Sequence, residues 1–174
     1  GSATTTASSA SLLGNYLAAG TSDGRVSLMQ IRFTPQYQEQ TMADLAIDLR
    51  GRGLIDIDPA RRPVRDVSYL EQEGQKFVAA LVTERDIACW WTDADAKEWR
   101  ASLTVPAPER VTALRLGRNG ALVAGTDRGN VYHWLPQPGM RLTDVSPVGG
   151  GGITALEWVL GGKSFVAGTE DGSL

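Results

Sequence analysis

A short segment recurs four times along the chain, and this repeat restricts the possible folds more than any other feature. Each copy is an apolar run, then a threonine, then polar turn residues. In three of the four copies a glycine stands directly before the threonine. The marker threonines are Thr21, Thr83, Thr126 and Thr169. The last three are spaced by 43 residues, whereas the first two are 62 apart, one period plus 19. A regular period of this length indicates a fold built from repeated supersecondary units.

Two further features follow the same period. Segments 64–69, 111–116 and 153–158 each begin with Val or Ile and precede a marker threonine. Trp91 and Trp134 each stand eight residues after their threonine. A period of about 40–45 residues with short strands and a late tryptophan is typical of β-propeller blades, which have four strands each.

Local patterns also favour strands. Apolar and polar residues alternate from Trp99 to Val105, and the alternation between 25 and 33 slips at Leu28–Met29, as at a β-bulge. Asp-Gly pairs at 23–24 and 171–172 suit tight hairpin turns. Only residues 41–49 suggest a short helix.

We therefore predict an all-β chain that forms a partial β-propeller of about three to four blades, with four-stranded antiparallel WD-like repeats. Residues 1–11 are expected to be a tag and low-complexity start. The blades are expected at roughly 12–58, 64–105, 111–146 and 153–174, with the first incomplete and the last truncated. Because a closed propeller needs four to eight blades, we expect a fragment, or a chain that another copy completes through open strand edges.

Composition argues against several function classes. The net charge of −3 offers no general attraction to nucleic acid or to an anionic membrane surface. The single cysteine, Cys89, lies in an apolar run and is expected to be buried and inert. The single histidine, His133, has no acid–base partner at a suggestive spacing. We predict no catalytic residue, no cofactor and no metal site.

Two motifs resemble ligand loops only in part. Asp93-Ala-Asp95 lacks the further oxygen ligands of a calcium loop, so it is interpreted as a turn between strands. The run Gly149–Gly152 has no following lysine and precedes a strand, so it is interpreted as a linker between blades.

Five arginines surround the 19-residue excess between the first two repeats, and they are the candidate partner-binding residues. They are Arg50, Arg52, Arg61, Arg62 and Arg65. Insertions between repeats usually form exposed loops that can carry function, and a basic loop could contact an acidic partner or anionic headgroups. The alternative is a solvated loop with scattered arginines. Replacing Arg61 and Arg62 by Glu is expected to leave folding intact, because both side chains should be exposed.

Several segments together resemble a known family. These are Asp93–Asp95 with Glu98-Trp99-Arg100, then 106–114, 129–134, 141–148 and 153–162. They are similar to the soluble extra domain of the enlarged phosphate ABC-transporter permease of PstC type, found in some proteobacteria. The resemblance covers most of residues 16–174.

The resemblance implies a non-catalytic accessory domain that takes part in protein–protein interaction or regulation of phosphate uptake. Its partners would be other transporter subunits or the phosphate-binding protein. The parent would be an inner-membrane protein with this domain in the periplasm. The alternative is a free WD-repeat-like scaffold of an intracellular assembly, with a cytoplasmic location. A propeller enzyme is a third class, and the shortage of acid–base groups argues against it.

Overall fold

The computed structural model describes residues 3–10, 15–38, 41–92, 100–136, 139–159, 161 and 163–174, apart from the side chains of 42 and 100–103. In these ranges the chain forms strands and one short 3-10 turn, η1 (Arg118–Gly120). The strands make separate antiparallel sheets in which sequential strands are neighbours. The prediction of an all-β chain is therefore confirmed.

Four sheets follow one another along the chain. The first contains β1 (Thr5–Ala10), β2 (Tyr16–Thr21), β3 (Arg25–Gln38) and β4 (Thr41–Asp56). The second contains β5 (Asp66–Gln72), β6 (Gln75–Leu81), β7 (Asp86–Trp91) and β8 (Arg100–Pro106). The third contains β9 (Val111–Leu116), β10 (Leu122–Thr126), β11 (Asn130–Leu135) and β12 (Arg141–Pro147). The described part of the fourth contains β13 (Ile153–Val159) and β14 (Ser164–Thr169).

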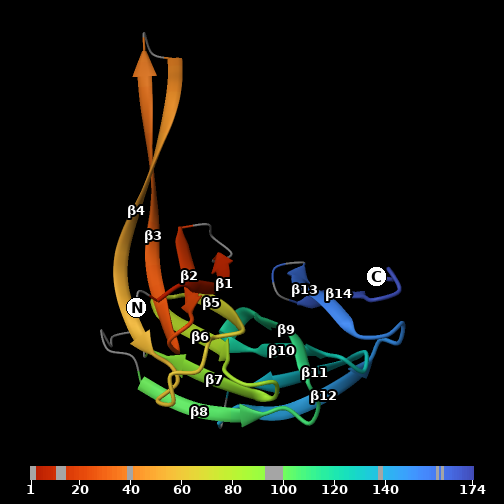
Figure 1. Cartoon of the computed structure of the whole chain (residues 1–174). Coiled ribbons are helices and arrows are strands. Elements are labelled where there is room, and N and C mark those ends of the chain that lie inside the picture. The colour runs from red at the N-terminus through yellow and green to blue at the C-terminus, as the bar shows by residue number, and fades with distance from the viewer. Residues whose placement is uncertain are drawn as a thin grey trace.

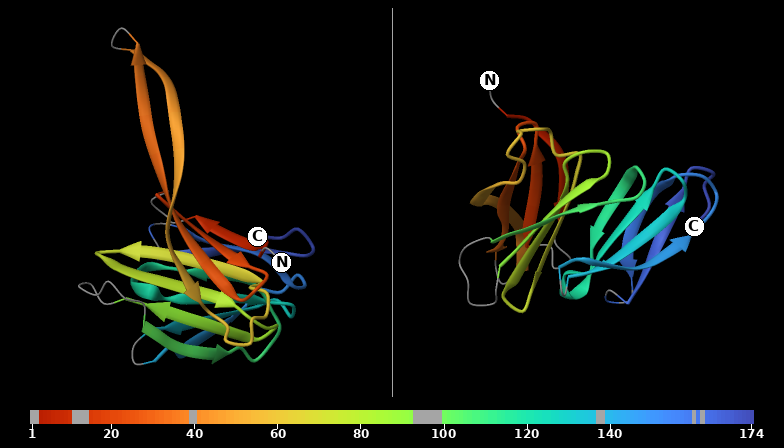
Figure 2. Two further views of the ribbon diagram at one scale, coloured as in Figure 1. Left: turned by 60° about the vertical axis from the view of Figure 1, so that its left-hand side comes forward. Right: turned by 90° about the horizontal axis from the view of Figure 1, so that it is seen from below.

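The sheets are arranged as propeller blades. β5 contacts both β1 and β9, and β9 contacts β13, so the first strands of successive sheets lie side by side. Figures 1 and 2 show the sheets fanning out from these first strands. An apolar cluster fills each space between neighbouring blades, and Val67, Leu114 and Ile153 are fully buried members of the three clusters. Each blade thus buries a face on the next, as the repeat predicted.

The start of the chain and residues 41–49 differ from expectation. β1 lies in the stretch assigned to a low-complexity start, and it pairs with β2 from Thr5↔Thr21 to Ala10↔Leu17. The hydroxyl of Thr6 also donates to the carbonyl oxygen of Val64, at 2.6 Å. The helix expected at 41–49 is wrong, because these residues belong to β4 and pair with β3, with Ala43 as an extra residue at a bulge. The alternation of Leu45, Ile47 and Leu49 with Ala46 and Asp48 has the period of a strand.

Each marker threonine holds the turn that follows its strand. The hydroxyl of Thr21 donates to Asp23, and that of Thr169 donates to Asp171, both at 2.6 Å. Thr83 donates to Asp86 at 2.9 Å. In the third blade the acceptor is Glu109, which precedes the first strand, at 2.6 Å. The threonine recurs in every copy of the repeat because its hydroxyl forms hydrogen bonds both with a carboxylate and with backbone groups of the turn.

The glycine before the threonine serves contact between blades. A Cβ atom on Gly20 would lie 2.5 Å from Cγ1 of Val64, and one on Gly125 would lie 2.6 Å from Cβ of Ile153. Val64 and Ile153 precede or open the first strand of the next blade, and both are fully buried. The backbone N–H of Val64 also donates to the carbonyl oxygen of Thr21, at 3.1 Å. The blade therefore needs glycine before the threonine, because the next blade places a β-branched side chain against that position.

We predict that Gly125→Val destabilises the chain by about 1–3 kcal/mol, because overpacking this contact must displace Ile153. Gly51→Val is the matched control, since a Cβ atom at Gly51 meets nothing within 4 Å. Thermal unfolding followed by circular dichroism measures both. Equal melting temperatures for the two variants would show that the blades tolerate a side chain at this contact.

Candidate interaction surface

β3 and β4 continue well beyond the sheet they belong to. β2 pairs with β3 only from Gly20↔Val26 to Tyr16↔Gln30, and the N–H of Ile31 makes a last bond to the carbonyl oxygen of Asn15, at 2.8 Å. Beyond that point β3 and β4 pair with each other as far as Gln38↔Thr41. We call residues 31–38 and 41–50 the ribbon. It stands clear of the blades in Figure 1 and in the left view of Figure 2.

One face of the ribbon is apolar and open to solvent. Cross-strand pairs on this face are Ile31↔Leu49, Phe33↔Ile47 and Pro35↔Leu45. We call these six residues the apolar ribbon face. Ile47 is 64% exposed and Leu49 is 55% exposed. Tyr37, near the tip, is 67% exposed.

The opposite face of the ribbon is polar. Its cross-strand pairs include Arg32↔Asp48, Gln30↔Arg50 and Gln36↔Asp44. An amphipathic two-stranded hairpin has too little buried surface to be stable by itself. Folded monomers rarely leave a contiguous apolar surface of this kind uncovered unless it binds something. The ribbon is therefore the candidate interaction surface.

A β-bulge decides which face of the ribbon is apolar. Met29 pairs with Gly51 and Leu28 pairs with Gly53, so Arg52 is an extra residue in β4. The apolar ribbon face therefore continues onto the side of the first sheet that carries Leu54, which is 53% exposed. The polar face continues onto the side that carries the buried Leu28 and Ile55, against the second blade. The slip expected at Leu28–Met29 thus corresponds to a bulge in the partner strand.

Sequence reasoning placed function in this excess but chose the arginines and missed the apolar face. The signal was the alternation of Leu45, Ile47 and Leu49 with charged or small residues, matched by Ile31 and Phe33. That alternation was interpreted as a short helix, so its exposed face was not recognised.

The five candidate arginines do not form one positive patch. Nε of Arg50 lies 2.8 Å from Asp48, and Arg52 donates to Gln30 at 2.9 Å. In the connection to the second blade, Arg61 lies 4.0 Å from Asp23, and Arg65 lies 3.7 Å from Glu84. Each of these charges already has a polar partner within the chain.

Arg62 has a structural contact. Its Nε donates to the carboxylate of Asp58 at 2.7 Å, and its Nη2 lies 3.1 Å from the other oxygen. Asp58 is buried, and its N–H donates to Gly24 at 3.0 Å, so this pair fastens the connection between blades to the first blade. The hydrogen bonds from Arg62 lower the pKa of Asp58 to about 2. Arg62 is exposed as expected, at 49%, but it also bonds the buried Asp58, so we expect its reversal to destabilise the fold.

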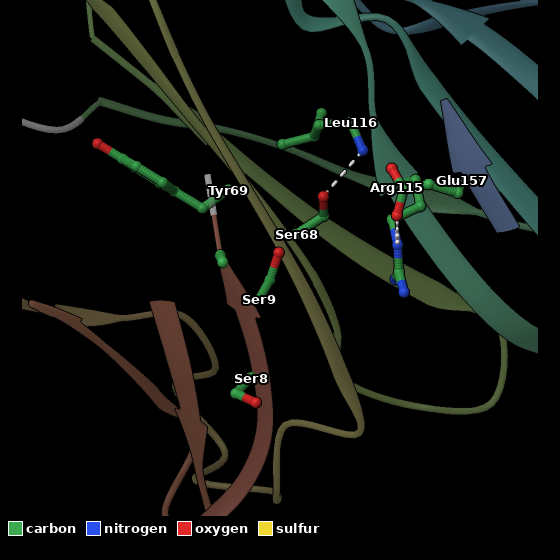
Figure 3. Close-up of a pocket in the computed structure, with 8 residues that line it drawn as sticks. Ser8, Ser9, Ser68, Tyr69, Arg115, Leu116 and Glu157 are labelled. Carbon is green, nitrogen blue, oxygen red and sulfur yellow. Dashed lines mark hydrogen bonds and ion pairs between the residues drawn. The ribbon is translucent and has the colours of Figure 1, made fainter. Parts of the chain in front are cut away.

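A small pocket lies where the first strands of the blades meet. Its volume is about 250 Å³, and it is lined by Ser8, Ser9, Ala10, Ser68, Tyr69, Arg115, Leu116 and Glu157. Nη1 of Arg115 lies 3.7 Å from Asp66, and its Nε lies 3.5 Å from Glu157. The hydroxyl of Ser68 accepts a bond from the N–H of Leu116 at 2.9 Å, which Figure 3 shows. Burial raises the pKa of Asp66, and the nearby Arg115 opposes this rise.

These polar groups connect the second blade to the third. Asp66 accepts a bond from the N–H of Leu114 at 3.0 Å, in addition to its ion pair with Arg115. Ser68 and Asp66 lie on β5, whereas Leu114, Arg115 and Leu116 lie on β9. The pocket's polar groups thus take part in holding blades together.

The remaining motifs show no reactive cluster within the described ranges. The ring of His133 lies 6.1 Å from that of Trp158, and burial lowers the pKa of His133. The backbone N–H of Gly152 donates to Glu170, at 3.2 Å, so the glycine run lies against the turn after β14. Burial raises the pKa of Cys89 to about 12. Asp93 and Asp95 lie outside the described residues.

Neither a metal cluster nor a membrane span is found in the part of the chain that the structure describes. Its His, Cys, Asp and Glu residues form no group of three or more that could hold a metal ion. None of its helices has the length and hydrophobicity to cross a bilayer.

Comparison with known proteins supports the fold. No protein-family model and no curated protein matches this chain. The structure resembles a chain in the crystal structure of a mitotic checkpoint complex, with a TM-score of 0.59 and 14% identity over 96% of this chain. It also resembles the Cps50 (Swd1) β-propeller domain of Myceliophteria thermophila, with a TM-score of 0.57 and 19% identity over 96% of this chain.

These neighbours are longer than this chain. The match covers 44% of the first and 49% of the second, so the chain spans about half of either. At these identities the likeness establishes the propeller fold alone.

We predict that Arg62→Gln lowers the free energy of unfolding at neutral pH more than Arg61→Gln does, because it leaves the buried Asp58 without its main partner. Arg61→Gln is the matched control, since the Arg61 guanidinium lies as far as 3.9 and 4.0 Å from Asp56 and Asp23. Urea unfolding measures both.

At acid pH, the wild type and Arg62→Gln should have the same free energy of unfolding. The folded pKa of Asp58, about 2, lies below the ordinary value of 3.8, so the carboxylate stabilises the fold above pH 3.8. This stabilisation is lost as pH falls from 3.8 towards 2. A difference that stays constant to pH 2.5 would rule out the Asp58–Arg62 pair as its source.

Proposed function

We propose that this chain is a non-catalytic protein-binding module, a propeller scaffold that presents the ribbon to a protein partner. The observation that carries the proposal is the apolar ribbon face, which is exposed on an element outside the propeller core. This proposal corresponds to the scaffold interpretation of the sequence.

The chemistry of the ribbon favours a protein partner. All six residues of the apolar ribbon face are uncharged, and Tyr37 adds an aromatic side chain near the tip. Burial of apolar surface is the dominant favourable contribution to most protein–protein association, and tyrosine is enriched among the residues that contribute most. The acidic chain, with its net charge of −3, gives no general attraction to a nucleic acid.

A narrower proposal places the module in the phosphate permease family. It is supported by the resemblance of segments such as 106–114 and 153–162 to the enlarged PstC-type permease. In that setting the domain would face the periplasm, and its partner would be another transporter subunit or the phosphate-binding protein. The five arginines, from Arg50 to Arg65, remain candidates for contacts with such a partner.

The narrower proposal predicts measurable binding of the phosphate-binding protein. Titration calorimetry with the purified chain, with and without phosphate, should give a dissociation constant in the micromolar range. Arg65→Glu should weaken it, because the Arg65 side chain is exposed and its guanidinium lies 3.7 Å from Glu84. Absence of binding up to about 1 mM, with or without phosphate, would remove the phosphate-binding protein as a partner.

The broader proposal predicts face-specific protein contacts in the cell. A photo-crosslinking amino acid at Ile47 samples the apolar ribbon face, and the same amino acid at Thr34 samples the opposite face of the same ribbon. We expect at least about fivefold more polypeptide adduct from Ile47, because a partner on the apolar ribbon face or along the neighbouring edge of β4 lies within reach of Ile47 and not of Thr34. Equal or negligible adducts from the two positions would contradict a docking role for the ribbon.

A further inference from the structure

We propose that the occupant of the ribbon is a second copy of this chain, paired antiparallel along the outer edge of β4 about a two-fold axis at Ile47. This inference rests on the proposed function, because it takes the ribbon as the docking element. It adds the identity of the partner and the register of the contact.

The outer edge of β4 is open and suited to pairing. β4 is the last strand of the first sheet, so one of its edges lacks a neighbour in the described structure. Natural proteins usually protect such an edge with proline, charged side chains, β-bulges or a short strand. β4 is 16 residues long and contains neither proline nor lysine, and between its bulges at Ala43 and Arg52 the segment from Asp44 to Gly51 pairs regularly with β3. β3 carries Pro35, which cannot donate to a further strand.

β4 complements itself when Ile47 faces Ile47 of the second copy. In this antiparallel register Leu45 lies opposite Leu49, and Asp44 lies opposite Arg50. The two-fold axis repeats each of these pairs. Cross-strand apolar pairs and opposite charges stabilise adjacent strands, and the apolar residues of both copies come to lie on one side of the joined sheet. Arg50, now 2.8 Å from Asp48 on the surface, would lie between two carboxylates.

Neighbouring registers are less favourable. An axis at Ala46 would place Asp44 opposite Asp48, and an axis at Asp48 would place that carboxylate opposite its own copy. Like charges directly opposite destabilise a strand pair. Of these three adjacent registers, only the one at Ile47 brings opposite charges together without opposing two acids.

The proposed pairing leaves room for both propellers. With the axis at Ile47, the regular segment from Asp44 to Arg50 pairs with its own copy, so the tip of one ribbon lies beside the base of the other. The blades of the two copies then lie at opposite ends of the joined ribbons, because each ribbon projects away from its own blades (Figure 1). The contact is isologous, as in the commonest symmetric dimers.

Sedimentation equilibrium of the purified chain over about 1–200 μM tests the pairing. We expect a monomer–dimer equilibrium that Arg50→Asp weakens about tenfold and that Asp44→Arg combined with Arg50→Asp restores. Thr34→Asp is the matched control, because Thr34 lies on the polar face of β3 and should leave the dimer intact. A monomer at every concentration would overturn the proposal.

Engineered cysteines test the register. Ile47→Cys should form a disulfide between copies, because directly opposite strand residues have Cα atoms about 4.5–5.5 Å apart, within disulfide reach. Leu45→Cys should not, because the two copies of this residue would lie about 14 Å apart, four residues along the strand. The native Cys89 is buried with a raised pKa and should not compete.

The results separate the inference from the function on which it rests. Equal disulfide formation at Ile47 and Leu45, or a dimer insensitive to the Asp44 and Arg50 exchange, would overturn the proposed register. If Ile47 crosslinks to a different protein and the purified chain sediments as a monomer, the partner is not a second copy, but the ribbon remains a docking element. Loss of face-specific crosslinking would instead remove the docking role.

Discussion

The propeller depends on the close approach of each blade to the next at the repeated turn. Gly20 and Gly125 leave no space for a side chain beside Val64 and Ile153. The neighbouring threonine fixes the turn through its hydroxyl, and backbone bonds such as Val64 to Thr21 tie blade to blade. Stability in such an array comes largely from neighbouring-repeat interfaces, so this contact sets the spacing that lets the apolar clusters form.

The contacts within and between the blades also hold several buried or half-buried polar groups. Asp58 is held by Arg62, Asp66 by Arg115 and the N–H of Leu114, and Ser68 by the N–H of Leu116. A buried polar group needs such partners, because leaving it unpaired costs more than a typical hydrogen bond contributes. These groups orient connections and neighbouring strands.

The ribbon differs from the blades, because it exposes apolar side chains of the kind that the blades bury. The bulge at Arg52 is the physical reason. The extra residue reverses which side chains of β4 point to each face of the sheet. On one side of the bulge Leu28 and Ile55 are buried against the second blade, and on the other side Phe33 and Ile47 face solvent. The surface available for binding is therefore set by one extra residue in one strand.

The repeat by itself determined that the chain is all-β, divided into blades with conserved turns, because threonine spacing and strand alternation are local properties of the sequence. It also located the 19-residue excess between the first two repeats. Only the tertiary structure decided what that excess does. Whether Leu45, Ile47 and Leu49 form a helix or a strand depends on pairing with β3. Whether Arg62 is a free surface charge or the partner of a buried carboxylate depends on the burial of Asp58. Likewise, Thr5–Ala10 becomes a strand through pairing with β2, since its small polar residues carry no strong signal of their own.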